Sequence, residues 1–479
     1  MIPMNVMIDL YICIPEIVVA IGSLLLLLMG VFSRGKNLFL LIFFPIIILS
    51  IAFFALIMMN CEGIGFSGTC ISDKLSFFVK SIILASSIVI FIMMLNCVHL
   101  KPFSRFEFPV VILIAILGML LVISSNDMIS FYMALELLSL SLYIAIAMNR
   151  DSMISIESAM KYFILGAFSS CFLLYGMSFI YGFTGHTDFL HIATSLFVGN
   201  NSFVIIIGIV FILIGLFFKI ALVPFHMWIP DVYEGSPMLV TAFLATVPKF
   251  TVAMALLRIT SVFWPVISGL THIFMIVSVL SMVLGSIAAI GQKKIKRLMA
   301  YSSIGNAGYA LVGFSTGTLV GISATVRYMV IYLIMLLGFF ACILPLRNKA
   351  GKGVSNIADL SGLSQYDPFL ACIITILTFS MAGIPPFAGF FGKYFLFSAA
   401  MRNEYYYLVI IGLLSSVISA YYYLRIISVM WFNKPTEGFM VVRREIKPIA
   451  LMIGLFVICY LLFENFIGFW IDKIVLSLF

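Results

Sequence analysis

Hydrophobic runs separated by short polar breaks extend along almost the whole sequence. A bilayer core is crossed by about 20 apolar residues in a helix, and runs of that length predict about 14 membrane helices. Only Asn126 and Asp127 separate the fourth run from the fifth. Because no connection leaves room for a soluble domain, we expect one all-α integral membrane domain, residues 1–479. The expected helices are 10–32, 38–59, 75–97, 108–125, 128–148, 157–182, 202–222, 238–264, 269–291, 297–318, 324–346, 368–396, 405–432 and 448–470.

Composition agrees with a lipid environment, since 63% of the residues are hydrophobic and only 10% are charged. The net charge of +8 does not indicate nucleic-acid binding, because the basic residues gather in alternate connections. With the N-terminus outside, the outward side holds only Lys74, Arg402, Lys473 and, at the start of the eleventh run, Arg327. The positive-inside rule then predicts that both termini face outward. The inward residues are Arg34, Lys36, Lys101, Arg105, Arg150, Lys293, Lys294, Lys296, Arg297, Arg347, Lys349, Lys352, Lys434, Arg443, Arg444 and Lys447.

The eight cysteines show neither CxxC pairs nor a cluster with histidines, so we expect no metal or iron–sulfur site. Cys61 and Cys70 share one outward connection, and whether they form a disulfide is left open by the sequence. The same connection contains a GxGxxG match at Gly63–Gly68. It follows a membrane helix rather than a strand, so we interpret it as a turn and not as a dinucleotide site.

Charged residues inside the expected helices are the strongest sign of function. A charge at the bilayer centre costs at least about 2.5–3.5 kcal/mol. Near the ends of their helices, Glu16, Lys80 and Arg258 are expected to snorkel toward the interface. Structural ion pairs between helices are the alternative interpretation of the others. The basic residues inside the expected helices are Lys80, Lys161, Lys219, Lys249, Arg258, Lys393 and Arg425, and the central acidic residue is Glu136.

Lysine suits a proton relay better than arginine does. Desolvation disfavours the charged amine, so a lysine in a dry pocket can release and regain a proton near neutral pH. Arginine stays protonated under the same conditions. The local chemistry therefore favours an ion path, with the proton as the ion.

Two of these lysines lie beside breaks in their helices. Pro224 follows Lys219 in the seventh expected helix, and Pro385 and Pro386 precede Lys393 in the twelfth. Irregular backbone at membrane depth is tolerated where it lines a cavity or is buried in protein. The breaks are five helices apart, and an odd offset reverses direction across the membrane, which is typical of inverted-repeat transporters. We expect N-terminal helices at 10–97, one five-helix repeat at 108–264, its inverted copy at 269–432, and a last helix at 448–470.

Four motifs carry a resemblance to a known family: Phe218–Pro237 (FKIALVPFHMWIPDVYEGSP), Met160–Phe163 (MKYF), Ala300–Tyr309 (AYSSIGNAGY) and Ser380–Phe397 (SMAGIPPFAGFFGKYFLF). They resemble the antiporter-like membrane subunits of proton-translocating NADH–quinone oxidoreductase, respiratory complex I. The related subunits are types L, M and N and the Mrp-type cation–proton antiporters. Chain length and the lysine at position 393 are most similar to the N type.

The resemblance implies roles for individual residues. Glu136 and Lys219 would form a carboxylate–lysine pair, Lys249 would be the central relay lysine, and Lys393 would exchange protons with the outer side. Asn306 stands where many relatives have histidine, so the polar chain there would run through Ser302, Ser303 and water. Hydrogen bonding at the helix break is an equal alternative for His226. The secondary polar path implied by the resemblance is Lys161, His226, Ser302 and Ser303.

The resemblance also implies the setting. The chain would be a proton-pumping subunit that holds no redox cofactor, while other subunits oxidise NADH and reduce quinone. Its partners would be the other membrane-arm and redox subunits and the lipid bilayer, in a bacterial inner membrane or, alternatively, a mitochondrial one. The rival interpretations are a stand-alone or Mrp-type cation–proton antiporter and a purely structural spacer.

Overall fold

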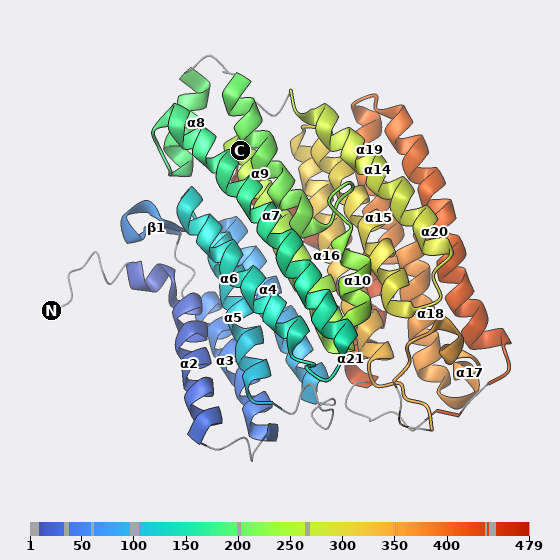
Figure 1. Ribbon diagram of the computed structural model, residues 1–479. Coiled ribbons are helices and arrows are strands. Elements are labelled where there is room, and N and C mark those ends of the chain that lie inside the picture. The colour runs from blue at the N-terminus through green and yellow to red at the C-terminus, as the bar shows by residue number, and fades with distance from the viewer. Residues whose placement is uncertain are drawn as a thin grey trace.

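The computed structural model is an all-α bundle whose helices run mostly side by side (Figure 1). It describes residues 9–32, 38–58, 62–95, 105–198, 203–263, 269–349, 351, 353–435, 438–439 and 447–478. The elements are α2 Ile14–Phe32, α3 Leu38–Met58, β1 Gly63–Gly65, η1 Phe66–Gly68, β2 Cys70–Ser72, α4 Lys74–Leu95, α5 Glu107–Ser124, α6 Met128–Ala147, α7 Met153–Thr184, α8 Phe189–Val198, α9 Phe203–Ile220, α10 Trp228–Gly235, α11 Met238–Ala245, α12 Val247–Val262, α14 Thr271–Ile290, α15 Ile295–Ser315, α16 Leu319–Ile343, η3 Ile357–Leu360, α17 Leu363–Tyr366, α18 Pro368–Ala382, α19 Ala388–Arg402, α20 Tyr406–Phe432 and α21 Lys447–Leu476.

The prediction of an all-α membrane protein is confirmed. Within the described residues, twelve helices are long and apolar enough to cross a membrane. Two expected helices are interrupted in the structure: 238–264 is divided into α11 and α12, and 368–396 into α18 and α19. The expected helix at 297–318 corresponds to α15.

The short polar break at 126–127 separates α5 from α6 because Asp127 caps the second helix. Its carboxylate accepts hydrogen bonds from the backbone N–H groups of Ile129 (2.9 Å) and Ser130 (3.1 Å). These N–H groups have no partner within the helix, so a capping carboxylate favours a new helix start at this position. Two antiparallel neighbours therefore replace what hydropathy alone would read as one long run.

Small residues let the helices approach closely where no side chain intervenes. At the contact of α14 with α15, a Cβ added to Gly285 would lie 2.5 Å from the backbone nitrogen of Gly305. Where α7 meets α9, a Cβ on Gly176 would lie 2.5 Å from the carbonyl oxygen of Gly208. Such close backbone packing is the usual basis of helix association in lipid. It makes α14–α15 and α7–α9 rigid pairs that bracket the interior.

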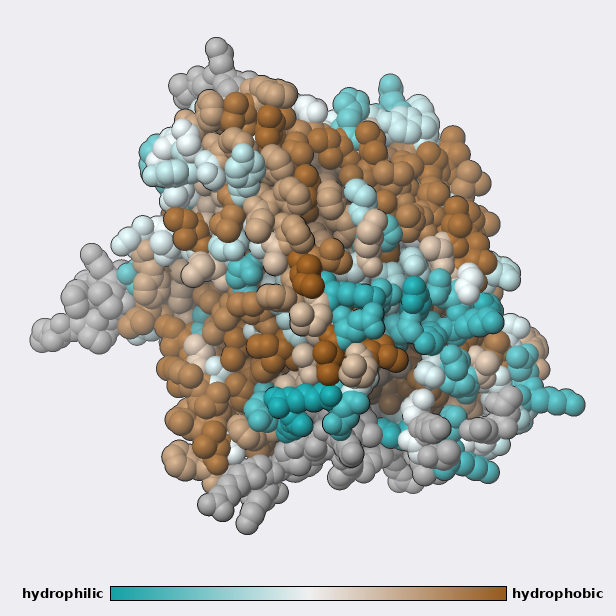
Figure 2. Space-filling view, in the orientation of Figure 1, coloured by the Kyte–Doolittle hydropathy of each residue, from teal (hydrophilic) through white to brown (hydrophobic). Residues whose placement is uncertain are grey.

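The two ends of the bundle differ. The connections that carry Arg150, Lys293 and Arg347 lie at the end with α10 and α17, which we call the basic end (Figure 1). The opposite end carries the β1–β2 hairpin, α8 and the last turn of α19. Figure 2 shows hydrophobic side chains over much of the visible lateral face, with hydrophilic ones gathered around α10. The lateral face is thus suited to lipid or to other membrane helices.

Snorkelling was the wrong expectation for Lys80, Glu16 and Arg258. Lys80 on α4 lies 2.7 Å from Glu16 on α2, and both side chains are at most 3% exposed. Arg258 on α12 lies 2.9 Å from Asp73 and is 6% exposed. Each basic group therefore forms an ion pair with a carboxylate inside the protein and does not extend to the membrane interface.

Candidate functional site

The first helix break follows Lys219 at the end of α9. Ala221 has φ 65°, a left-handed conformation that a residue with a Cβ adopts only rarely. The N–H of Ala221 donates to the Phe218 carbonyl at 3.0 Å and the N–H of Leu222 donates to the Phe217 carbonyl at 2.9 Å. This pattern is a Schellman motif, which closes a helix end by using its last carbonyls.

The segment between α9 and α10 is then fixed by side chains from elsewhere. Trp228 donates its indole N–H to the Phe218 carbonyl at 3.0 Å, and the backbone N–H of Val223 donates to Ser281 Oγ on α14 at 3.0 Å. Backbone polar groups inside a membrane protein need such partners, since lipid offers none. These hydrogen bonds stabilise the break, which leaves Lys219 at a helix terminus.

The second break repeats this geometry between α18 and α19. Gly383 has φ 88°, its N–H donates to the Ser380 carbonyl at 3.0 Å, and the N–H of Ile384 donates to the Phe379 carbonyl at 3.1 Å. Ser380 Oγ accepts from the N–H of Gly389 at 2.9 Å, which ties the start of α19 to the end of α18. Both breaks thus use the same Schellman pattern around one left-handed residue.

Lys393 points back into the second break. Its Nζ donates to the carbonyls of Ala382 (3.1 Å) and Met381 (3.4 Å), two groups at the end of α18. Its ammonium also lies 4.6 Å from the ring centroid of Tyr309. Among the ion pairs of the described residues, none involves Lys393. Carbonyl dipoles and an aromatic face therefore hold this amine in place of a carboxylate.

In this structure, serine hydroxyls are the hydrogen-bond partners of both Lys219 and Glu136. Lys219 Nζ donates to Ser139 Oγ on α6, and Ser139 in turn donates to the Leu135 carbonyl at 2.6 Å. Glu136, three residues before Ser139, accepts a hydrogen bond from Ser170 on α7. Glu136 and Ser139 lie on α6 within one turn, so the carboxylate acts on the Lys219 ammonium of α9 through space, while the serine makes the hydrogen bond.

Lys249 occupies the centre of the bundle, on the first turn of α12. A kink at Thr246, with φ −109° and ψ −87°, separates α12 from α11. Lys249 Nζ donates to Ser303 Oγ on α15 at 2.7 Å and lies 5.6 Å from the ring centroid of Tyr233. Its side chain is 3% exposed. The amine is thus fully inside the protein, with a neutral hydroxyl as its partner.

Lys219 and Lys249 line the same cavity. The cavity measures about 20 Å³, and Ser139 on α6 and Tyr162 on α7 also line it. That volume holds about one water molecule, and the amines and the hydroxyl supply the polar partners that a buried water needs. Lys219 and Lys249 thus share a cavity with room for about one water molecule.

On the other side of Lys249, α15 presents a chain of polar side chains toward Lys393. Ser302 is hydrogen-bonded to Tyr423 on α20, and Asn306 Nδ2 donates to Ser302 Oγ at 3.2 Å. Tyr328 on α16 donates to Asn306 Oδ1 at 2.7 Å. Asn306 thus connects three helices at the position where a histidine was expected from the family pattern, and both of its amide groups are used.

Two of the predicted secondary residues lie apart from this interior. Lys161 is 46% exposed and pairs with Glu157 (2.8 Å) and Asp231 (3.1 Å) near the basic end. The sequence pattern had placed Lys161 inside an expected membrane helix. His226 lies half-buried in the first break, where its Nδ1 is buried without a hydrogen-bond partner.

The acidic residues after the first break belong to a charged network at the basic end. Glu234 is paired with Lys294 and lies 2.9 Å from Arg297 Nη1, while Lys296 donates to the Glu234 and Ser236 carbonyls at 2.6 and 2.7 Å. Partial burial acts to raise the pKa of Glu234, but hydrogen bonds from Lys294 and Arg297 outweigh it and hold that pKa below its usual 4.5. The network fastens α10 to the start of α15.

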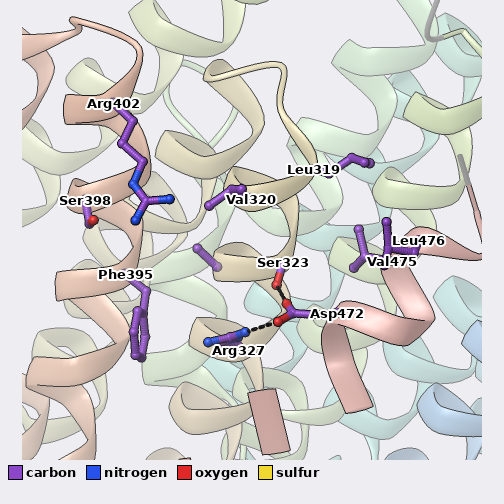
Figure 3. Close-up of a pocket in the computed structure, with 11 residues that line it drawn as sticks. Leu319, Val320, Ser323, Arg327, Phe395, Ser398, Arg402, Asp472, Val475 and Leu476 are labelled. Carbon is purple, nitrogen blue, oxygen red and sulfur yellow. Dashed lines mark hydrogen bonds and ion pairs between the residues drawn. The ribbon is translucent and has the colours of Figure 1, made fainter. Parts of the chain in front are cut away.

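A larger cavity of about 430 Å³ opens between α16, α19 and α21 toward the opposite end (Figure 3). Arg327 on α16 lies 2.7 Å from Asp472 on α21, and its guanidinium is 5.1 Å from the Phe395 ring centroid. Glu464 pairs with the same arginine at 3.1 Å. Lys393 is not among the lining residues, so this cluster ties α21 to the bundle and does not open onto the buried amine.

Comparison with known proteins shows which family the chain resembles in sequence. The family model described as NADH:quinone oxidoreductase/Mrp antiporter, TM, matches residues 125–419. The NADH-quinone oxidoreductase subunit N 1 of Rhizobium meliloti (strain 1021) is 49% identical over 96% of this chain and 96% of its own length. The chain belongs to the NADH-quinone oxidoreductase subunit N family.

Solved structures agree on the fold. A chain of respiratory complex I from Thermus thermophilus with bound aureothin has a TM-score of 0.81 at 29% identity, covering 95% of this chain and 98% of that one. A chain of the Mrp complex from Dietzia sp. DQ12-45-1b has a TM-score of 0.84 at 19% identity, covering 98% of this chain and 97% of that one. At that identity the Mrp likeness shows the fold alone. The expected family is confirmed, and Lys219, Lys249 and Lys393 all lie within the residues that the family model matches.

Proposed function

We propose that this chain is a proton-translocating membrane-arm subunit of an NADH–quinone oxidoreductase, assembled with other complex I subunits in a bacterial inner membrane. The observation that carries the proposal is the line of buried amines Lys219, Lys249 and Lys393, each bonded to neutral oxygen acceptors. Buried ammonium groups without direct carboxylate partners are costly, and a proton carrier is the function that such groups serve best.

In the proposed relay, the distance between the Glu136 carboxylate and the Lys219 amine controls whether Lys219 is protonated. A rearrangement that moves the carboxylate from Ser170 toward Lys219 would stabilise the ammonium, and the return movement would favour proton release. A released proton would cross the shared cavity through one water to Lys249. Such transfer over single hydrogen-bonded steps requires groups within about 3 Å or one intervening water.

From Lys249 the proton would continue along α15. Ser303 accepts from Lys249, and the neighbouring Ser302 and Asn306 lead toward Tyr328 and the second break. Ser302 and Ser303 are consecutive residues with separate hydrogen-bond partners, so this step needs a rotation of a hydroxyl or an intervening water. Lys393 would then exchange the proton with the outer side.

The inverted repeats at 108–264 and 269–432 form part of the same proposal. Their support is the matching end of α9 and α18, where a left-handed residue at 221 or 383 is followed by a proline three residues later. The lysines do not occupy equivalent places, since Lys219 precedes its break and Lys393 follows its own. One amine therefore lies before the left-handed turn and the other folds back onto it, which favours different roles at the two breaks.

We also propose that both termini face the outer side, with the basic end inward, since positively charged connections are retained on the cytoplasmic side. The chain contributes no redox chemistry in this proposal, and electrons pass through other subunits. Relatives at 44–49% identity are named NADH-quinone oxidoreductase subunit N, which favours this role over an independent Mrp-type antiporter.

Replacement of Lys249 by alanine tests the relay. We expect the Lys249→Ala complex to assemble, and NADH-driven acidification of inverted vesicles to fall by at least about tenfold, because general acid–base groups contribute 10²–10⁴-fold. Lys293→Ala, which removes an exposed lysine at the basic end, is the matched control. Normal pumping with Lys249→Ala would overturn the relay and favour a structural spacer. Autonomous cation–proton exchange without redox subunits would favour the antiporter.

A further inference from the structure

Two cysteines meet at the end of the bundle opposite the basic end. Cys70 lies in β2, paired with Gly65 of β1, and Cys13 is a buried residue just before α2. The hairpin packs directly on the chain before α2, since a Cβ added to Gly65 would lie 3.1 Å from Asp9 Oδ1 and 3.2 Å from Ile12 Cδ1. This packing brings Cys13 and Cys70 together, and the contact between the two thiols shifts the pKa of each.

The surroundings favour reaction at Cys70. The hydrogen bond from Cys13 lowers the pKa of the Cys70 thiol to about 7, although partial burial acts in the opposite direction. Of the nearby charges, Glu16 on α2 raises this pKa and Lys80 on α4 lowers it. A lowered pKa favours the thiolate, which is the reactive form of a cysteine. Cys70 is partly exposed, whereas Cys13 is buried behind it.

We propose that Cys13 and Cys70 form a disulfide that ties the N-terminal helix to the β1–β2 hairpin. The proposal rests on the outward orientation given above, because disulfides form in the oxidising compartment outside the inner membrane. It differs from the Cys61–Cys70 pairing considered from the sequence, of which Cys61 lies outside the described residues.

The oxidant is a protein disulfide of the outer compartment. The Cys70 thiolate attacks one sulfur of that disulfide, forming a mixed disulfide and releasing the other sulfur as a thiolate. The Cys13 thiol loses its proton to water and attacks the Cys70 sulfur, which releases the second sulfur of the oxidant. Two electrons pass from the two cysteines to the oxidant, which becomes a dithiol.

Counting thiols in the assembled complex tests this directly. Cells are quenched in acid, and the chain is unfolded and treated with N-ethylmaleimide before and after reduction. With eight cysteines in the chain, we expect six to react before reduction and eight after it. Mass spectrometry should find the peptide containing Cys13 joined to the peptide containing Cys70. The link should persist in Cys61→Ser and disappear in both Cys13→Ser and Cys70→Ser.

Eight reactive thiols before reduction, or a Cys61–Cys70 link, would overturn the proposal. The variants also keep it separate from the proposed relay, because neither cysteine is a hydrogen-bond partner of Lys219, Lys249 or Lys393. NADH-driven pumping by Cys13→Ser and Cys70→Ser should stay within about twofold of the parent complex. Loss of pumping in Lys249→Ala with an intact Cys13–Cys70 link would support both proposals. Normal pumping in Lys249→Ala would refute the relay proposal and leave the disulfide proposal unaffected.

Discussion

Lys219 and Lys249 come from different helices and line one cavity with room for a single water molecule. Neither amine has a carboxylate within ion-pair distance among the described residues, and each donates to a serine hydroxyl instead. A proton shared between them is therefore not held by a fixed opposite charge on either side. Ser139 and Ser303 therefore set the positions of the two amines.

Ser139→Ala removes the hydroxyl that accepts from Lys219. A hydrogen bond to a charged group contributes about 1.5–3 kcal/mol, so the protonation equilibrium of Lys219 should shift by about tenfold or more. We expect NADH-driven pumping in inverted vesicles to fall several-fold while the complex still assembles. Ser141→Ala is the matched control, since Ser141 Oγ donates only to the Leu137 carbonyl of its own helix. Equal pumping by both variants would contradict the role of Ser139.

Asn306→Leu should interrupt the polar chain between Lys249 and Lys393. The substitution leaves Tyr328 and Ser302 without the amide that now joins them, while the side chain keeps its branched shape. We expect pumping to fall by at least about tenfold, with NADH oxidation measured in parallel. Asn306→His, which restores the residue common in the family, should retain most of the activity. If the leucine variant pumps normally, the proton does not pass along α15.

Much of this site could be predicted from sequence because its signals are local. The prolines predicted both helix breaks. Lys219, Lys249 and Lys393 stood out because each is a charged residue within an apolar run. The partners of these lysines could not be predicted in the same way. Met381 and Ala382 act through carbonyls, which any residue carries, so nothing in the side chains marks them. The family resemblance suggested a Glu136–Lys219 pair, but nothing in the sequence marked Ser139 and Ser170 as the hydrogen-bond partners of these two groups.

Pairs between distant helices were also beyond local patterns. Glu16, Lys80 and Ser124 come from three separate helices and meet only in the packed bundle. A hydropathy profile records that each lies near the end of a run, which explains the expectation of snorkelling. Likewise, Lys161 lies inside the expected helix 157–182, and its partner Asp231 comes from α10, which no local pattern brings next to it.

Lys80→Met should destabilise the N-terminal helices strongly. It removes the partner of Glu16, whose side chain is 3% exposed, and a buried charge left alone costs about 3–5 kcal/mol. The double variant Glu16→Gln with Lys80→Met should recover most of that loss, because no uncompensated charge remains. Thermal unfolding of the purified subunit in detergent measures the loss of stability in the single variant and its recovery in the double variant. A double variant less stable than the single one would show that the pair itself stabilises the bundle.

Glu234→Gln should weaken the tie between α10 and α15 in a pH-dependent way. The folded-state pKa of Glu234 lies below its usual 4.5, so its stabilising contribution is fully present above that value. It is lost as the pH falls through the lowered folded pKa. Because the network faces solvent, we expect at most about 1 kcal/mol at pH 7. The difference in unfolding temperature between parent and variant should therefore vanish in acid, and a difference that grows in acid would contradict this.

The carbonyl acceptors of Lys393 have a consequence for how this position responds to mutation. Substitutions at 381 or 382 change side chains but leave the two acceptor oxygens in place. Only a change that lets α18 continue as an unbroken helix would withdraw them, since their oxygens would then bond to N–H groups further along. The hydrogen-bond acceptors of this amine are therefore main-chain atoms, and point substitutions that preserve the helix break leave them in place.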